Sequence, residues 1–443
     1  MLALLLDRLE AFDGLEWLIR ETKTRRLESY NIKKQSEMRR EVETTSLNLV
    51  VYSTFSEDGK KYRGSYSTEI HPGTSPEELH AKIASGVLTA SFIKDEYFPL
   101  VESSPAMAEV TTETDAHRAM ADLQAAFYSG DCRDAGHLSY SEFFITRNEK
   151  RILNSRGVDL SYTTYNIFVE TAVHWQSQQG KEIEILESYQ TSLPMVPPSD
   201  TAAVCGMLKD RVAHLFAVAE KKSLARPTPQ VGDINILLTG ECLAEFFCYY
   251  HSCADAQMVY QQLSTFKEGA MVQGAGDTPC DRLSLTLEPK LEGSSHSSPY
   301  DEYGLPLDSH TIIRDGKLLK YWGDTRFSSY LDIDPTGNIL NFHVTGGTAT
   351  GEDLRREPYL ELVSFSDFQM DPVTGDFGSE IRLGFYFDGE TTVPVTGGSI
   401  SGNMAMVQDS LRMSVEERQY NHYRGPATIC IRGASISGNK QHE

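Results

Sequence analysis

The sequence predicts an α+β protein in which a mixed α/β lobe precedes a mostly β lobe. Helix and strand patterns mix up to about residue 190, a long helical pattern occupies residues 191–226, and alternating runs with turn signals dominate residues 227–443. The segment Pro227-Thr-Pro-Gln-Val-Gly232 is rich in residues that end regular structure, and it predicts the linker between the lobes. We therefore expect an N-terminal lobe of residues 1–190, a connecting helix of residues 191–226 and a C-terminal lobe of residues 227–443.

The N-terminal lobe is expected to begin with an amphipathic helix. Asp7 and Arg8 interrupt an initial apolar run, which is far too short to span a membrane, and a signal peptide would need a basic segment before it. The helix should therefore pack on its own domain or on a partner subunit. Its expected apolar face consists of Leu2, Leu5, Leu6, Leu9 and Phe12.

A hairpin and two helices are expected next. Residues 47–55 and 61–67 favour strands and flank Glu57-Asp-Gly59, a combination typical of a hairpin. Residues 76–93 and 114–128 have helical periodicity, and Leu79, Ile83 and Val87 share one face of the first helix.

A set of strands and a long helix complete this half of the chain. Residues 139–175 and 183–189 alternate apolar and polar side chains, which predicts strands. Ser199-Asp200 is the expected start of the long helix. The apolar stripe of that helix is expected to be Val204, Leu208, Val212, Leu215 and Phe216.

The segment 234–251 opens the second lobe and is the most informative part of the chain. Residues 234–238 predict a buried strand, and Thr239 can cap the helix that follows. The helix should bury Leu243, Phe246, Phe247 and Tyr250, which follow the i, i+3, i+4, i+7 pattern. The opposite stripe, directed away from the core, consists of Glu241, Glu245, Cys248 and Ser252.

Hairpins are expected to dominate the remainder of the second lobe. Arg314-Asp-Gly-Lys317 and Phe387-Asp-Gly-Glu390 each place Asp-Gly between alternating apolar runs. Few helical patterns occur after about Gln262.

Composition narrows the function classes. The formal charge of −22 argues against nucleic-acid binding, because phosphate contacts need clustered Lys and Arg. An acidic chain is also a poor match for anionic membranes, so we expect a cytoplasmic protein with neither nucleic-acid nor membrane partners. Seven cysteines without framework spacing fit free thiols in a reducing compartment.

Four segments in order resemble the TldD/PmbA family, a peptide-processing metalloprotease system once named for modulation of DNA gyrase. They are Asn154-Ser-Arg-Gly-Val-Asp-Leu-Ser-Tyr162, Ser298-Pro-Tyr-Asp-Glu-Tyr-Gly-Leu-Pro306, Asp371-Pro-Val-Thr-Gly-Asp-Phe377 and Pro394-Val-Thr-Gly-Gly-Ser-Ile-Ser-Gly-Asn403. The resemblance covers about the last two thirds of the chain. It implies that the C-terminal lobe is antiparallel and barrel-like.

In the catalytic, TldD-like branch, the turn between strand and helix carries HExxxH, whose histidines bind zinc while its glutamate is the general base. The same pattern placed here falls on Gly240, Glu241 and Glu245, so only the glutamate remains. The family's third ligand is a cysteine before a Gly-x-Pro segment. Residues 409–423 contain no cysteine, and Cys430 lies beyond Gly425-Pro426. The zinc ligands are therefore missing, as in the PmbA (TldE) branch.

Zinc chemistry supports this interpretation. A catalytic zinc needs about three protein ligands and an open position, and glycine offers none. Glu245 alone would hold zinc weakly, and an exposed helix face is the alternative interpretation of Glu241 and Glu245. The group Cys242, Cys248, His251 and Cys253 spreads around the helix and is more typical of partly buried thiols than of a metal site.

The resemblance implies a PmbA (TldE)-like, non-catalytic subunit of a zinc metalloprotease that degrades or trims unfolded peptides. Zinc would belong to a TldD-like partner, and this chain would bind no cofactor. One alternative is a self-sufficient metallopeptidase that acts as a homodimer, in which Glu241 and Glu245 recruit a metal alongside ligands that the sequence does not identify and Glu241 is the candidate catalytic residue. Another is a peptide-binding or scaffold protein without enzymatic activity. A co-purifying chain with an intact HExxxH would separate these hypotheses.

Overall fold

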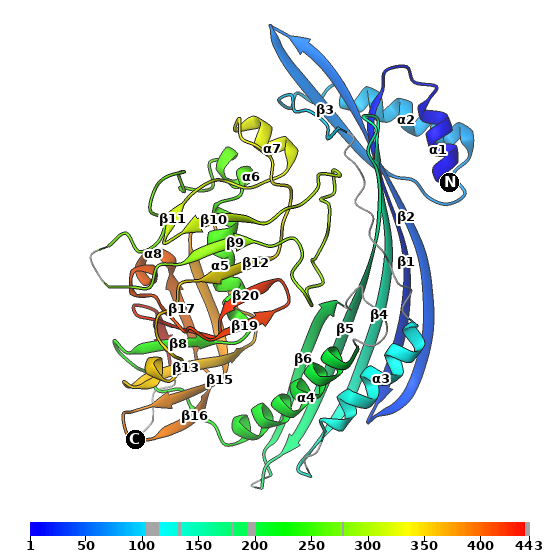
Figure 1. Cartoon of the computed structure of the whole chain (residues 1–443). Coiled ribbons are helices and arrows are strands. Elements are labelled where there is room, and N and C mark those ends of the chain that lie inside the picture. The colour runs from blue at the N-terminus through cyan, green and yellow to red at the C-terminus, as the bar shows by residue number, and fades with distance from the viewer. Residues whose placement is uncertain (103–114, 132–133, 179, 193–200, 277–278, 439–443) are drawn as a thin grey trace.

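The computed structural model describes residues 1–102, 115–131, 134–178, 180–192, 201–276 and 279–438. It has two lobes (Figure 1): a curved sheet of long strands with helices, and a compact lobe of shorter strands around a central helix. The two lobes lie side by side, so that the last strand and the long helix of the first lobe face the second.

One antiparallel sheet of six strands forms the first lobe, in the order β3-β2-β1-β4-β5-β6. Its strands are β1 (Glu16–Ile32), β2 (Gln35–Glu57), β3 (Lys60–Glu69), β4 (Gly136–Asn154), β5 (Asp159–Gln176) and β6 (Glu182–Ser192). The predicted hairpin is confirmed as β2 and β3, joined through Asp58 and Gly59, which both have positive φ. The predicted strand set is confirmed as β4, β5 and β6.

Helices cover the sheet at two places. Near the N-terminus, α1 (Leu2–Leu9) and α2 (Pro76–Ala90) pack on β2 around the buried Leu5, Leu9 and Ile83, as their periodicity predicted. The hydroxyl of Ser75 and the carboxylate of Glu78 form a capping box at the start of α2.

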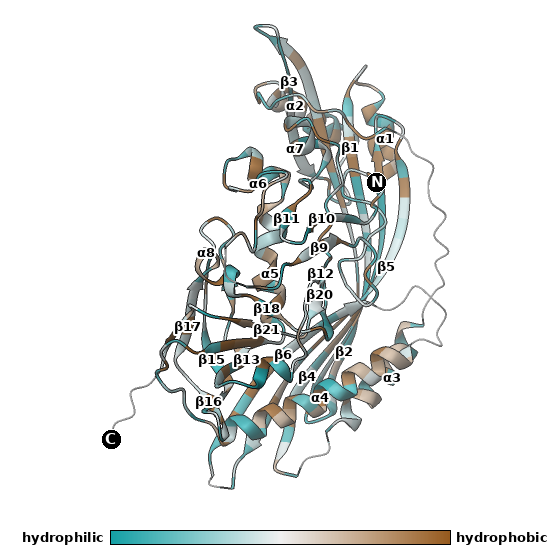
Figure 2. Ribbon diagram, turned by 60° about the vertical axis from the view of Figure 1, so that its left-hand side comes forward, coloured by the Kyte–Doolittle hydropathy of each residue, from teal (hydrophilic) through white to brown (hydrophobic). Residues whose placement is uncertain are grey.

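Further along the sheet, α3 (Ala116–Ser129) and α4 (Thr201–Ser223) pack together on a second apolar cluster. Figure 2 shows α4 banded with hydrophobic and hydrophilic residues, as expected for a helix with one face on a sheet. Its predicted stripe is confirmed: Val204, Leu208, Val212, Leu215 and Phe216 are all buried. The predicted helix start at Ser199-Asp200 lies outside the described residues.

Two sheets form the second lobe. One has the order β11-β10-β9-β12-β20-β19, and the larger has the path β18-β21-β8-β13-β15-β16-β7. Most neighbours are antiparallel, as the fold class predicted, but β8·β13, β12·β20 and β7·β16 are parallel. The strands are β7 (Arg226–Pro227), β8 (Asn235–Thr239), β9 (Ser284–Leu287), β10 (His310–Arg314), β11 (Lys317–Leu318), β12 (Phe342–Thr345), β13 (Tyr359–Phe365), β14 (Gln369–Met370), β15 (Asp376–Phe387), β16 (Thr392–Thr396), β17 (Ser399–Asn403), β18 (Arg412–Met413), β19 (Glu417–Tyr420), β20 (Tyr423–Pro426), β21 (Thr428–Ile431) and β22 (Ser435–Ser437).

Both Asp-Gly hairpins are confirmed. Asp315 and Gly316, at φ 48° and 76°, join β10 to β11. At the second hairpin, the Asp388 carboxylate accepts backbone N–H bonds from Glu390 and Thr391 in a slightly longer loop between β15 and β16. Few helices lie in this part of the chain, namely α5 (Cys242–Cys253), α6 (Ala256–Tyr260), α7 (Thr325–Tyr330) and α8 (Met404–Val407).

The linker prediction needs a correction in detail. Arg226 and Pro227 form β7, which pairs with β16, and the next N–H, from Thr228, donates to the carbonyl of Thr396. Thr228 is fully buried. Proline is tolerated here because β7 is an edge strand and needs no ladder donor on its outer side. The connection therefore joins the largest sheet as its last strand.

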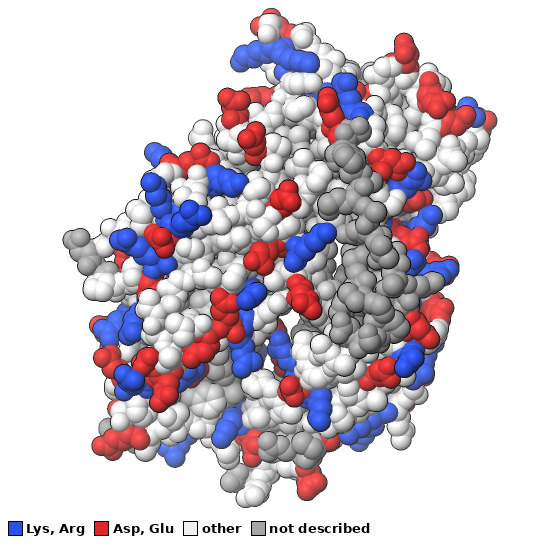
Figure 3. Space-filling model, in the orientation of Figure 1, with Lys and Arg blue, Asp and Glu red and all other residues white. Residues whose placement is uncertain are grey.

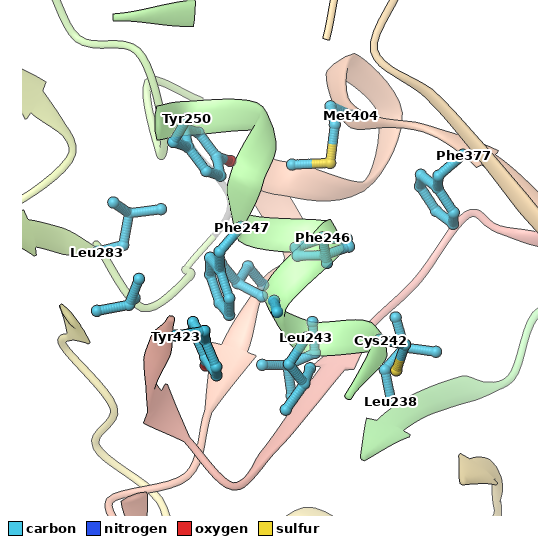
Figure 4. Close-up of a cluster of buried hydrophobic side chains, with 14 of the residues drawn as sticks. Leu238, Cys242, Leu243, Phe246, Phe247, Tyr250, Leu283, Phe377, Met404 and Tyr423 are labelled. Carbon is cyan, nitrogen blue, oxygen red and sulfur yellow. The ribbon is translucent and has the colours of Figure 1, made fainter. Parts of the chain in front are cut away.

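The core of the second lobe surrounds α5 (Figure 4). Phe247 stacks on Tyr423 with ring centroids 5.7 Å apart, and Phe246 packs edge-on against Phe377 at 5.8 Å. Among the described helices of both lobes, none is long and apolar enough to cross a membrane.

Candidate functional site

The turn between β8 and α5 requires glycine. β8 lies between β13 and β21 in the largest sheet, so α5 begins at the end of a fully buried strand. Gly240 makes the turn with φ of +103°, a conformation that residues with a side chain rarely adopt. A Cβ atom at this position would lie 3.3 Å from the carbonyl oxygen of Val363. The backbone at the first HExxxH position is therefore fitted to glycine.

The predicted cap of α5 is wrong. The N-cap residue is Glu241, and no side chain caps the helix. The Thr239 hydroxyl instead donates to the carboxylate of Glu361 at 2.9 Å, and Arg355 holds that carboxylate from the other side through its Nε at 2.9 Å. Thr239 is the last residue of β8, so its side chain belongs to the sheet and not to the helix.

The two predicted faces of α5 are confirmed. Leu243, Phe246, Phe247 and Tyr250 are each 0% exposed. On the other face, Glu241 and Glu245 are exposed, while Cys248 and Ser252 are half-buried and lie 3.4 Å apart at their sulfur and oxygen atoms.

The thiols and the imidazole of α5 each have a separate environment. The Cys253 thiol donates to the carbonyl of Pro372, and the His251 Nε2 atom lies 2.9 Å from the carbonyl oxygen of Ile339. Burial lowers the pKa of His251 to about 4 and raises the pKa of Cys253 to about 12. Within the described ranges, no three His, Cys, Asp or Glu side chains are grouped so that they could hold a metal ion.

A cavity of about 1080 Å³ lies between the lobes, directly over the polar face of α5. Its walls come from β6 and α4 of the first lobe and from α5, β13, β14 and β15 of the second. A second cavity of about 460 Å³ continues past Glu241 and Glu245, between β6, α4 and the β19–β20 hairpin. The two carboxylates of the degenerate motif thus stand where the cavities meet.

The free edge of β6 runs along both cavities. β6 is the last strand of its sheet, and every residue from Ile185 to Ser192 lines one cavity or the other. Since successive side chains of a strand point to opposite faces, a cavity that contacts all of them must follow the strand's edge. Among the described residues, the backbone hydrogen bond on this edge lies at its end, where the Ser192 N–H donates to the carbonyl of Gly293.

An arginine from α4 connects the two lobes inside this site. The Arg211 guanidinium lies 3.4 Å from the carboxylate of Glu241 and 3.8 Å from that of Glu187 on β6. It also lies over the ring of Tyr189, 4.8 Å from the centroid. The Glu241 carboxylate is therefore engaged with a cation.

Desolvation dominates the titration of these carboxyl groups. Burial, with a contribution from the negative charge of Glu241, raises the pKa of Glu187 to about 7 against the opposing effects of a hydrogen bond from Tyr189 and of the charge of Arg211. Desolvation by the cavity walls also raises the pKa of Glu241, although 56% of its side chain is exposed. The pKa of Glu245 is raised by desolvation and by the nearby Asp367.

Sequence reasoning located Gly240, Glu241 and Glu245 but missed Glu187 and Arg211. Glu187 is an even number of residues from the buried Ile183 and Tyr189, so it lies on the same face of β6. A carboxylate within this apolar row could have indicated a functional residue. Arg211 carried no such signal, because its partners are distant in sequence.

The donors at this turn do not fit a catalytic zinc. Gly240 has no donor atom, and the Glu241 carboxylate is turned to Arg211. Glu245 is the remaining candidate, and the described residues around it provide no second and third ligand.

A family comparison identifies the second lobe. The model described as the PmbA/TldA metallopeptidase C-terminal domain matches residues 231–438, a range that contains β8 and α5. Among curated relatives, the Metalloprotease PmbA homolog of Buchnera aphidicola is 23% identical over 332 residues, which cover 68% of this chain and 69% of that protein. Metalloprotease PmbA of Escherichia coli O157:H7 is 30% identical over 131 residues, covering 28% and 29%.

Solved structures share the fold along nearly the whole chain. A Thermotoga maritima protein described as a candidate modulator of DNA gyrase has a TM-score of 0.76 at 17% identity, covering 99% of this chain and 100% of that one. TldE from Thermococcus kodakarensis has a TM-score of 0.73 at 12% identity, also covering 99% and 100%. The predicted α+β fold of the TldD/PmbA type is confirmed by these matches. The second lobe therefore matches the PmbA/TldA metallopeptidase C-terminal domain, and the chain as a whole has the fold of the TldD/PmbA-type proteins.

Proposed function

We propose that this chain is a PmbA (TldE)-like, non-catalytic subunit that binds extended peptides and pairs with a TldD-like zinc subunit. The observation that carries the proposal is the geometry of the turn between β8 and α5, which contains Gly240 and Glu241. Gly240 has a φ of +103°, where a histidine would be strained, and Arg211 engages the one glutamate that remains. Zinc and the hydrolytic step would then belong to the partner.

The position of Arg211 argues against Glu241 as a general base. A base must be within hydrogen-bond reach of the water whose proton it removes. Here the Glu241 carboxylate lies 3.4 Å from a guanidinium, which lowers the proton affinity of its oxygen atoms and competes with a water molecule for them. The same ion pair connects α4 to α5, so it also has a structural role at the junction of the lobes.

The edge of β6 supports peptide binding. An exposed strand edge offers unpaired N–H and C=O groups to which an extended peptide adds as a further strand. Eight consecutive residues, Ile185 to Ser192, line the cavities, so the groove accommodates a peptide of several residues. Main-chain pairing is insensitive to side-chain identity, which suits the processing of unfolded peptides.

The test is a reconstitution. The purified chain should carry well below one zinc per molecule and show no chelator-sensitive peptidase activity. Addition of a TldD-like subunit with an intact HExxxH should produce activity that a chelator abolishes. Near-stoichiometric zinc together with peptidase activity in the isolated chain would overturn the proposal.

Glu241→Gln separates the proposal from the self-sufficient homodimer. In a self-sufficient enzyme with Glu241 as base, this change removes nearly all activity, because general-base catalysis contributes about 10²–10⁴-fold. In a non-catalytic subunit, the activity of the reconstituted pair should change less than about threefold, since Glu241 then only pairs with Arg211. If no TldD-like chain associates with the protein at all, the scaffold hypothesis is favoured instead.

A further inference from the structure

The larger cavity has a strongly one-sided charge. Among the residues that the structure describes, its lining includes six carboxylates and neither Lys nor Arg. They are Glu187, Glu241, Glu245, Asp367, Asp371 and Asp376. His214 also lines the cavity, but burial and the neighbouring Arg211 lower its pKa, so it adds no positive charge near pH 7. The outer face in Figure 3 mixes both signs, whereas the described lining of the cavity is acidic.

Some of these carboxylates already form hydrogen bonds or ion pairs within the protein. Asp371 accepts the N–H of Val373 at 2.8 Å, and Asp376 accepts from the Asn403 amide at 2.7 Å. Glu187 and Glu241 share the single guanidinium of Arg211. Among the described residues, Glu245 has neither an ion-pair nor a hydrogen-bond partner, and its nearest charged neighbour is another carboxylate, that of Asp367.

A second feature, independent of charge, points to a ligand in the same space. β6 is the last strand of its sheet, and among the described residues its outer edge is paired at one end, where the Ser192 N–H donates to the carbonyl of Gly293. The remaining edge runs along both cavities and offers main-chain donors and acceptors to an extended peptide. Tyr189 on that strand lines the second cavity and is 5% exposed, and its hydroxyl is directed to the Glu187 carboxylate.

The geometry also limits the kind of cation. The described carboxylates are not grouped so that three of them could hold a metal ion. A flexible organic cation, in contrast, can reach separate carboxylates, and an extended peptide on β6 presents every second side chain to one face of the strand.

We propose that the cavity selects peptide segments that carry a lysine or arginine side chain, which pairs with Glu245 and Asp367 while the peptide backbone lies along β6. This inference rests on the proposed peptide-binding role and adds a substrate class to it: basic, unfolded peptides are bound in preference to acidic ones. Arg211 is shared by Glu187 and Glu241, whereas Glu245 has Asp367 beside it and no cationic partner among the described residues, so a cation is what this side of the cavity lacks.

The experiment uses three labelled, unstructured decapeptides that differ only at one central residue: Lys, Gln or Glu. Binding is measured by fluorescence anisotropy with the full chain, both alone and paired with a zinc-depleted TldD-like subunit. The Lys peptide should bind at least about tenfold more tightly than the Glu peptide, with the Gln peptide between them. The difference should shrink as salt shortens the screening length from about 30 Å at 0.01 M to about 3 Å at 1 M.

A matched pair of variants assigns the preference to the cavity. Glu245→Gln should weaken binding of the Lys peptide by about three- to tenfold and leave the Gln peptide nearly unchanged. Glu390→Gln makes the same charge change on an exposed turn outside the cavity and should alter neither.

The outcomes separate the inference from the proposed function. If all three peptides bind equally, or if the two variants behave alike, the charge preference is overturned while peptide binding stands. If no peptide binds to the chain in either form, the peptide-binding role fails, and the selectivity fails with it.

Discussion

The two faces of α5 have opposite surroundings. The face toward the core is a complete apolar stripe, with Leu243, Phe246, Phe247 and Tyr250 all fully buried. The face toward the cavity carries the exposed Glu241 and Glu245, and Glu241 is paired with Arg211. Packing therefore determines the first face, whereas charge and solvent act on the second.

The largest expected effect tests the core face. Phe247→Ala should lower the free energy of unfolding of the second lobe by about 3–5 kcal/mol, because it leaves a cavity against the stacked Tyr423 ring. Denaturant unfolding followed by tryptophan fluorescence would measure this. The control is Glu245→Ala on the same helix, which removes an exposed side chain and should change the unfolding free energy by less than about 0.5 kcal/mol. Equal losses in the two variants would contradict the division of α5 into two faces.

Substitution of Gly240, in the turn that precedes α5, should have an intermediate effect on the free energy of unfolding. Gly240→Ala should cost about 1–3 kcal/mol, since the +103° φ is unfavourable for a residue with a Cβ atom. The same substitution at Gly206, an exposed helical position in α4 with no atom near its missing Cβ, should instead stabilise the protein by about 0.4–1 kcal/mol. Thermal unfolding of the two variants checks the opposite signs. If Gly240→Ala is neutral, the argument that this position cannot accept a ligand side chain loses its basis.

The sequence was sufficient for features that depend on local periodicity. The stripes of α4 and α5 repeat every three to four residues, and the hairpins carry Asp-Gly, so both could be predicted. The cap of α5 could not be predicted in this way, because Thr239 bonds to Glu361, 122 residues away. Residue preference favoured Thr239 as a helix cap, but its hydroxyl hydrogen-bonds instead to a side chain that is distant in the sequence.

The candidate site shows the same limit. Gly240, Glu241 and Glu245 were found because they are close in sequence and match a motif. The cavity, the free edge of β6 and the role of Arg211 depend on how one lobe faces the other, which periodicity does not encode. Pairs such as Arg211 and Glu241, 30 residues apart on separate elements, need the three-dimensional arrangement.

The smallest effect concerns the cavity face and its dependence on pH. The pKa of Glu187 is raised from 4.5 to about 7, mainly by burial. Between these two values the unfolded chain releases this proton while the folded protein keeps it, so the folded state becomes less stable as pH rises from about 4.5 to 7. Glu187→Gln removes the titrating group and should flatten that part of the stability curve. The gain relative to the native protein should reach about 1–2 kcal/mol above pH 7.

Urea unfolding at intervals from pH 4.5 to 8 measures this difference, and a second variant on the same strand serves as the control. Glu184→Gln changes an exposed carboxylate of β6 that lines neither cavity, so its curve should run parallel to that of the native protein. Parallel curves for all three proteins would mean that Glu187 is well solvated or fully compensated by Arg211. The cavity face of α5 would then be an ordinary polar surface, and its contrast with the core face would be one of burial alone.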